Sequence, residues 1–175
     1  EAMAEYLNHL GTDSLKRSQF VRVLYHIGAS INTSSSSQAV TVTLTGFDHL
    51  MQPAMAGLHN FLTCPKANKR AFNNLVQDSR MEEKTFFKEN SNIANALLGR
   101  VAYGDSSSYL CRMTAGELKK QGGEALVTLF KDVQRSQLDV VYTGQLADSV
   151  VERMVKSYVP IGQVSRPWRY IEHKL

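Results

Sequence analysis

The stretch GASINTSSSSQAVTVTLTGF, residues 28–47, indicates the fold class of this 175-residue chain. Over residues 40–44, apolar side chains alternate with threonines. A period of two is typical of a strand with one buried face. Residues 29–33 show a similar alternation before the serine run, so we predict an antiparallel hairpin that turns near residues 35–38. The serine run could instead be a flexible linker, as serine-rich segments often are.

Two helices are expected before the hairpin. Residues 1–10 have apolar positions at helical spacing, and Gly11 stands where a C-terminal cap is expected. A second helix is expected to begin at Asp13 or Ser14 and to end at Gly28. Its apolar stripe consists of Leu15, Phe20, Val23, Leu24 and Ile27.

The chain after the hairpin shows mainly helical patterns. Pro53 suits the first turn of a helix that runs to about Leu62, and Asn68 is expected to cap the next helix. A further helix is expected to end at Tyr103-Gly104, and Thr114 and Glu117 to form the capping box that begins another. Gly122-Gly123 should break that helix, and the last helix is expected to be capped near Asp148. The run LDVVYTG, residues 138–144, is apolar and rich in β-branched side chains, which predicts a buried strand. Residues 161–175 contain no clear period and are interpreted as a linker toward a following domain.

Three strands among six or seven helices predict an α+β fold, with helices packed on one face of an antiparallel sheet. Three strands are few for so many helices, and Glu1 falls inside a helical pattern. We therefore interpret the chain as a piece of a longer protein whose first strands lie upstream. A sheet cut at that point would have an open edge.

Composition excludes several function classes. Hydrophobic residues make up 43% and charged residues 21%, which are globular values, and the net charge is +4 with a pI near 9.1. The basic residues are scattered, which argues against a nucleic-acid-binding face. No apolar run approaches the ~20 residues of a membrane span. Cys64 and Cys111 could pair or stay buried and free, so they assign no compartment, and we expect Cys64 to be buried or inert.

The order of these parts resembles the M16 metallopeptidases, the family of pitrilysin, insulinase and the mitochondrial processing peptidases. YLNHLGT (6–12), the hairpin segment 28–47 and VVYTGQLADSVVERMVKSYVP (140–160) carry the resemblance, which covers roughly residues 1–160. It implies one M16-like domain with the LuxS/MPP-like metallohydrolase fold, lacking its first strands in this fragment.

Active members of that family carry His-x-x-Glu-His on their first helix. The two imidazoles and a distal glutamate bind zinc, and the intervening glutamate activates water. Aligned on Gly11-Thr12, this chain has Ala2, Glu5 and Tyr6 at those positions, so the glutamate remains and both histidines are absent. Glu82 and Glu83 fall about where the distal ligand is expected. The resemblance therefore implies no catalytic residue and no metal site in this chain, with zinc held by another domain of the parent protein.

The function implied by the resemblance is a non-catalytic, structural and peptide-contacting domain of a zinc-dependent metalloendopeptidase, inactive by itself. Its expected partners are other M16 domains of the same polypeptide or of a partner subunit, and a peptide substrate. The substrate-binding residues are not assigned, and SRPWRY (165–170) receives no role. An alternative is an assembly scaffold of the same fold without peptidase activity, like the core subunits of a respiratory complex.

A third hypothesis is a self-contained enzyme that uses Glu5, His9 and Glu82. Glu5 and His9 are four residues apart, a spacing that favours a solvated pair of side chains on one helix face over a metal site. His26, His49 and His59 have no partners at metal-ligand spacing and are expected at the surface or at helix ends.

Overall fold

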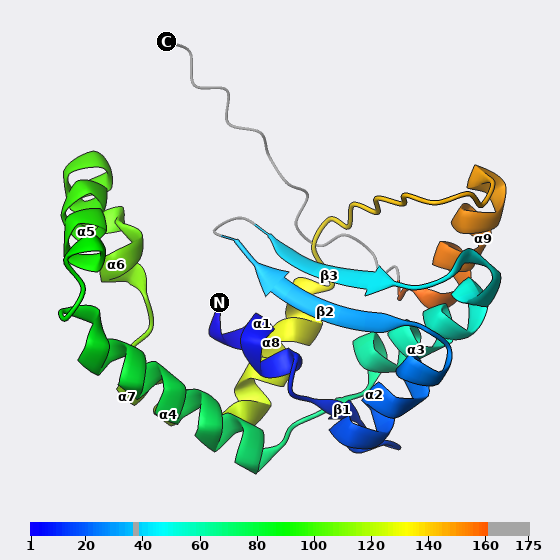
Figure 1. The fold of residues 1–175 in the computed structure, drawn as a ribbon, viewed down its shortest axis with the longest axis horizontal. Helices are drawn as coiled ribbons and strands as arrows, with labels where there is room; N and C mark the ends of the chain where they lie inside the picture. Colours follow the sequence, from blue (N-terminus) through cyan, green and yellow to red (C-terminus); the bar gives the residue numbers. More distant parts are fainter. Residues whose placement is uncertain (37–38, 161–175) are drawn as a thin grey trace, which may run out of the picture. The chain divides into compact units, whose positions relative to one another are not determined.

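The computed structural model describes residues 1–36 and 39–160 (Figure 1). These residues form two compact units. Of the described residues, the first unit contains Glu1, those between Met3 and Ala67, and those from Glu124 to residue 160, and the second contains Ala2 and Asn68–Gly123. The α+β class is confirmed, because many helices accompany a small amount of antiparallel sheet.

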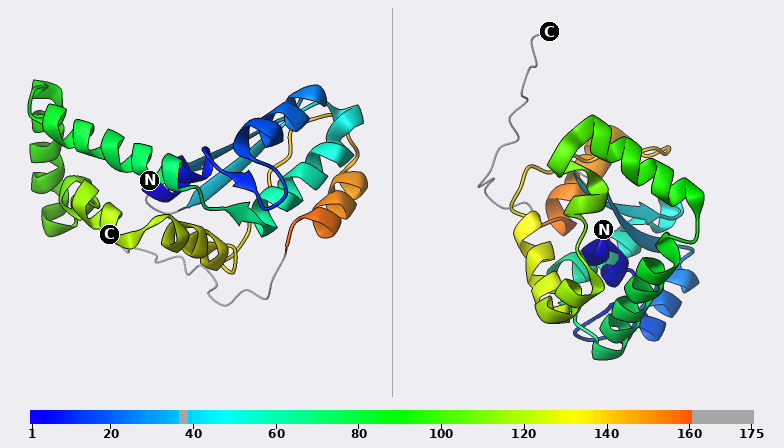
Figure 2. Two further views of the ribbon diagram at one scale, coloured as in Figure 1. Left: turned by 90° about the horizontal axis from the view of Figure 1, so that it is seen from below. Right: turned by 90° about the vertical axis from the view of Figure 1, so that its left-hand side faces the viewer.

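The first unit contains both strand pairs. Its elements are α1 (Ala2–Leu7), β1 (Gly11–Thr12), α2 (Arg17–His26), β2 (Ser30–Ser35), β3 (Val40–Thr45), the 3-10 turn η1 (Asp48–Leu50), α3 (Met51–Thr63), β4 (Pro65–Lys66), α8 (Gly123–Val133) and α9 (Asp148–Tyr158). The short strands β1 and β4 pair with each other. Helix α2 contacts β2 and helix α3 contacts β3 (Figures 1 and 2).

The predicted hairpin is confirmed as the antiparallel pair β2–β3, in which Ile31 lies opposite Leu44 and Thr33 opposite Val42. Residues 37 and 38 of the expected turn lie outside the described residues. Ile31 and Thr33 are buried, whereas Ser30, Asn32 and Ser34 and the threonines of β3 are exposed. The period of two therefore separates a buried face from a hydroxyl-rich exposed face.

The expected cap at Gly11 is wrong. Helix α1 ends at Leu7, and Gly11 lies in β1, where it pairs with Lys66. A Cβ at Gly11 would lie 2.2 Å from the carbonyl oxygen of Leu15, so the glycine permits a close backbone approach rather than a left-handed cap. By contrast Gly28, with φ of +61°, ends the region of α2 as predicted.

Helix α2 also begins later than predicted. Its N-cap is Lys16, whose backbone N–H donates to Oε1 of Gln19 at 3.1 Å. The preceding residues form a turn, closed by the Thr12 N–H donating to the Leu15 carbonyl oxygen at 2.9 Å. Of the predicted stripe, Phe20 and Leu24 are buried, but Val23 is 50% exposed.

The predicted buried strand at residues 138–144 is wrong. This segment has no strand partner among the described residues, and Val140 and Val141 are 52% and 91% exposed. Its β-branched composition suits a sheet, but a strand needs a neighbour to satisfy its backbone groups. The amphipathic helix α9 follows as expected, with Ala147 rather than Asp148 at its N-cap. The interpretation of residues 161–175 as a linker lies outside the described residues.

Aromatic packing forms the centre of the first unit. Phe61 of α3 is only 1% exposed, and its ring centroid lies 6.2 Å from that of Phe20 and 6.0 Å from that of Phe130. Tyr6 and Leu7 of α1 are completely buried in the same unit. The inward positions predicted for the helix after Pro53 are confirmed, since Leu58, Phe61 and Leu62 are buried.

The second unit is helical. Its elements are α4 (Lys69–Phe86), α5 (Asn90–Tyr103), the 3-10 turn η2 (Gly104–Ser106), α6 (Ser108–Cys111) and α7 (Ala115–Gln121). The predicted caps are confirmed: Oδ1 of Asn68 accepts from the N–H groups of Arg70 and Ala71, and Thr114 and Glu117 form a capping box. Gly104 and Gly122 have positive φ values where α5 and α7 end, as their sequence positions predict.

Candidate functional site

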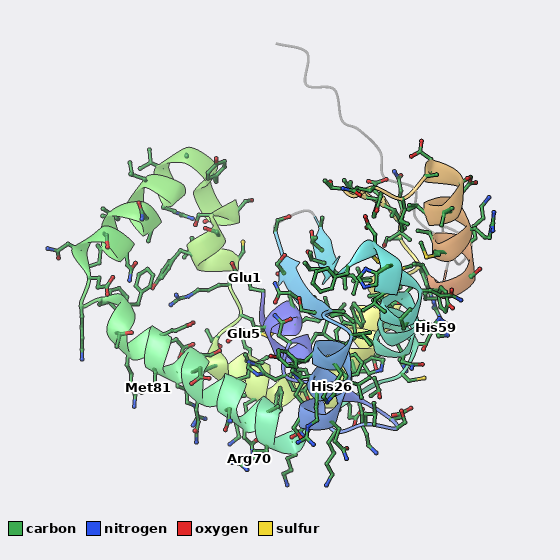
Figure 3. The ribbon with its side chains drawn as sticks, turned by 45° about the vertical axis from the view of Figure 1, so that its right-hand side comes forward. Glu1, Glu5, His26, His59, Arg70 and Met81 are labelled. Atoms are coloured by element: carbon green, nitrogen blue, oxygen red, sulfur yellow. The ribbon has the colours of Figure 1, made fainter. Side chains whose placement is uncertain are left out.

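The three residues that the sequence resemblance aligns with the zinc motif, Ala2, Glu5 and Tyr6, all lie in α1. Glu5 is exposed and extends from this helix (Figure 3), whereas Tyr6 has no exposed surface. A side chain with no exposed surface cannot reach a ligand in solution. Tyr6, which the sequence resemblance aligns with the second imidazole of an active member, is therefore an aromatic residue of the core.

The two candidate distal ligands belong to the second unit. Glu82 is exposed. Oε1 of Glu83 accepts the backbone N–H of Ala115 at 2.7 Å, and Ala115 is the first residue of α7. The first N–H groups of a helix have no partner within the helix, so Glu83 satisfies one of them from another helix. The structure gives Glu83 a capping contact, which the sequence does not indicate.

Among residues 1–36 and 39–160, no three His, Cys, Asp or Glu side chains are grouped so as to hold a metal ion. His9, His26 and His49 are exposed. His59 is half-buried, and its Nδ1 lies 2.7 Å from the carbonyl oxygen of Tyr158. Because a carbonyl oxygen only accepts, this hydrogen bond requires the Nδ1–H tautomer of His59. It links α3, on which Figure 3 labels His59, to the end of α9.

Of the expectation that Cys64 is buried or inert, burial is wrong, because both cysteines are exposed thiols. Helix α3 ends at Thr63, the next residue, Cys64, is exposed, and Pro65 at the start of β4 is buried. Cys64 belongs to the first unit and Cys111 to the second.

A shallow groove of about 430 Å³ lies along α9 in the first unit. Its lining residues are Val140, Tyr142, Asp148, Val151, Glu152, Val155 and Lys156. It holds valine side chains next to charged ones, and it contains no cluster of nucleophile and base. This composition suits a contact surface better than a catalytic site.

A hydrogen-bond network holds one wall of this groove. The Tyr142 hydroxyl donates to Oδ1 of Asp48 at 2.8 Å, and the Gln145 N–H donates to Oδ2 at 2.9 Å. These bonds lower the pKa of Asp48, the Gln145 N–H having the largest effect. Desolvation is the main cause that raises the pKa of Tyr142, and the Asp48 carboxylate raises it further. The network anchors the exposed segment 138–144 to η1.

The two outer edges of the hairpin differ. The side chain of Asn8 binds both backbone groups of Thr33: its Nδ2 donates to the carbonyl oxygen at 2.8 Å, and its Oδ1 accepts from the N–H at 2.7 Å. The backbone of Thr33 therefore faces away from β3. In an antiparallel ladder the opposite residue, Val42, then also directs its N–H and C=O outward. In the described part of the chain no strand pairs with that edge of β3.

No protein-family model and no curated protein matches this chain. Solved structures do match. The periplasmic protease PqqL from Escherichia coli gives a TM-score of 0.75 at 13% identity, covering 95% of this chain and 19% of that one. A mutant of the ferredoxin protease FusC, in complex with Arabidopsis ferredoxin, gives 0.79 at 10% identity, covering 98% and 19%. A conserved protein from Enterococcus faecalis V583 gives 0.72 at 13% identity, covering 97% and 47%.

These comparisons show the fold. The chain has the fold of a segment of the proteases PqqL and FusC, and it spans about a fifth of the length of each. This agrees with the resemblance found in the sequence. In the part of the chain that the structure describes, no helix is both long and apolar enough to cross a membrane.

Proposed function

We propose that this chain is a non-catalytic domain of a zinc-dependent M16 metalloendopeptidase, where it supports the structure and contacts peptide while another domain holds the zinc. The observation that carries the proposal is the burial of Tyr6, which the sequence resemblance aligns with a zinc-ligand position. Ala2, at the other ligand position, offers no donor atom. Glu5 alone supplies one carboxylate, which is a poor zinc site.

The peptide-contacting role draws support from the proteins that share the fold. PqqL and FusC are described as proteases, and the FusC structure holds ferredoxin. Each is about five times longer than this chain. A domain of this kind can shape the space around a polypeptide without taking part in the chemistry.

The unequal hairpin edges support the structural role. Asn8 occupies the edge of β2 at Thr33, so an added strand would meet the edge of β3, beside Val42. An unpaired edge of this length is a template for another strand. We propose that a strand from a neighbouring part of the parent protein completes the sheet there.

The zinc content of the purified 175-residue chain, measured by elemental analysis after dialysis against trace zinc, tests the non-catalytic assignment. We expect substoichiometric zinc that is unchanged in Glu5→Gln and in the matched control Glu1→Gln. One zinc per chain that is lost only in Glu5→Gln would overturn the proposal and restore a site built on Glu5 and His9.

The parent protein separates the proposed function from the scaffold alternative. We expect its hydrolysis of unfolded casein to stop when EDTA is added and to resume with zinc. A parent protein with no such activity would contradict the peptidase assignment and favour the scaffold.

A further inference from the structure

An arginine of the second unit lies over two aromatic rings. Arg112 follows α6, and its guanidinium carbon is 4.7 Å from the centroid of the Phe86 ring and 4.5 Å from that of Tyr109. The two rings also contact each other, with centroids 4.7 Å apart. Cation–π contacts of this kind fix the orientation of a guanidinium plane.

The same guanidinium lacks a carboxylate partner among the described residues. Arg100, in the same unit, pairs with Asp105, whereas Arg112 makes no ion pair or hydrogen bond with the described part of the chain. The rings contact the guanidinium through its positive charge and accept no N–H···O hydrogen bond. Its N–H donors therefore remain available to an oxygen acceptor from outside the described residues.

Exposed apolar side chains stand next to each member of this cluster in the sequence. Phe87 follows Phe86 and is 65% exposed, Leu110 follows Tyr109 and is 51% exposed, and Met113 follows Arg112 and is 47% exposed. The Phe87 ring also contacts the Phe86 ring, with centroids 5.3 Å apart. Exposed apolar side chains that adjoin a cluster in this way are typical of binding sites.

We propose that Arg112 binds the side-chain carboxylate of a glutamate or aspartate in a peptide segment whose neighbouring residues are apolar. The fork of N–H donors matches a carboxylate in two parallel hydrogen bonds. Because Phe86 and Tyr109 already hold the guanidinium, less conformational entropy is lost on binding than for a mobile arginine. The apolar side chains beside the cluster would receive the flanking residues of the peptide. The inference rests on the proposed function, since it names the kind of peptide that the domain contacts.

Fluorescence anisotropy with two synthetic peptides tests this site on the 175-residue chain. The probe is Gly-Ser-Leu-Glu-Leu-Gly-Ser with an amidated C-terminus and an uncharged fluorophore, and its partner peptide has Gln in place of Glu. The amide removes the terminal carboxylate, so only the side chain can supply the anion. We expect the Glu peptide to bind at least about tenfold more tightly, because hydrogen bonds between charged groups are the strong ones.

Variants locate the effect. Arg112→Gln is expected to abolish the preference for Glu, and Arg112→Lys to keep only part of it, because lysine retains the charge without the fork. Arg80→Gln, which removes an exposed arginine of α4 in the same unit, is the matched control and is expected to keep the full preference. Far-ultraviolet circular dichroism verifies that each variant is folded.

Equal binding of both peptides to the unmodified chain would overturn the inference, as would a preference for Glu that persists in Arg112→Gln. The inference would also be overturned if only peptides with a free C-terminal carboxylate bound in an Arg112-dependent way. The zinc and casein measurements test the proposed function independently, because neither involves Arg112.

Discussion

The helices α3 and α5 are similar in length and both carry the apolar spacing of an amphipathic helix, but their surroundings differ. In the first unit, α3 buries Ala54, Met55, Leu58, Phe61 and Leu62. In the second, α5 buries no residue, and Leu97, Leu98 and Val101 are 62%, 67% and 86% exposed. A helical pattern in the sequence therefore predicts the helix but not the burial of its apolar face.

Different interactions stabilise the two regions. The first unit has an aromatic core around Phe61, so apolar burial dominates. In the second unit α4 buries Phe72, Leu75 and Val76 and α7 buries Leu118, but α5 buries no residue. Other contacts of this unit include caps and the cluster at Arg112. Caps and local contacts each contribute only about 1 kcal/mol, so we expect α5 to open more readily than α3.

The largest effect is expected from removing the centre of the core. Phe61→Ala should lower the free energy of unfolding by about 3–5 kcal/mol, because it leaves a cavity between Phe20 and Phe130. Leu98→Ala removes a large apolar side chain from α5 and should change that free energy by less than about 0.5 kcal/mol. Urea denaturation followed by circular dichroism measures both. Equal losses in the two variants would mean that α5 is as well packed as α3.

The sequence predicted those features that depend on local chemistry. The hairpin follows from alternation, and the caps at Asn68 and Thr114 follow from side chains that satisfy nearby N–H groups. Gly28, Gly104 and Gly122 end helices where they were expected. Each of these signals lies within a few residues of the feature that it predicts.

Features that join distant segments were not predicted. The contact of Asn8 with Thr33 spans 25 residues, that of Glu83 with Ala115 spans 32, and that of Asp48 with Tyr142 spans 94. No local pattern marks such pairs. Gly11 failed as a predicted cap for the same reason, since a strand partner at Lys66 determines its conformation.

The second largest effect tests the edge of the hairpin. Asn8→Ala leaves the outward N–H and C=O of Thr33 without partners, which should cost about 1–3 kcal/mol. Asn32→Ala, at an exposed position of β2, is the matched control. Hydrogen exchange should show a faster Thr33 amide only in Asn8→Ala. An unchanged rate there would show that Asn8 does not protect this edge.

A smaller effect is expected in the second unit. Glu83→Ala removes the acceptor for the Ala115 N–H and should cost about 1 kcal/mol, a value typical of a helix cap. Glu83→Gln keeps an acceptor oxygen and should retain most of the stability, and Glu82→Ala is the exposed neighbouring control. The exchange rate of the Ala115 amide provides the local measurement. If the three variants behave alike, the carboxylate of Glu83 does not cap α7.

The smallest effect depends on pH and concerns Asp48 in the first unit. Its pKa is lowered in the folded chain by the Gln145 N–H and the Tyr142 hydroxyl, so its stabilising contribution is complete above the unfolded pKa of about 4. That contribution is lost as the pH falls from there through the folded pKa, because the protonated carboxyl accepts these bonds less strongly. Asp48→Asn cannot titrate, so its urea midpoint should fall less steeply below about pH 4 than that of the unmodified chain. Tyr142→Phe removes one of the two donors, so its urea midpoint should fall with an intermediate slope below about pH 4. Identical slopes in all three proteins would mean that segment 138–144 is held by contacts other than this network.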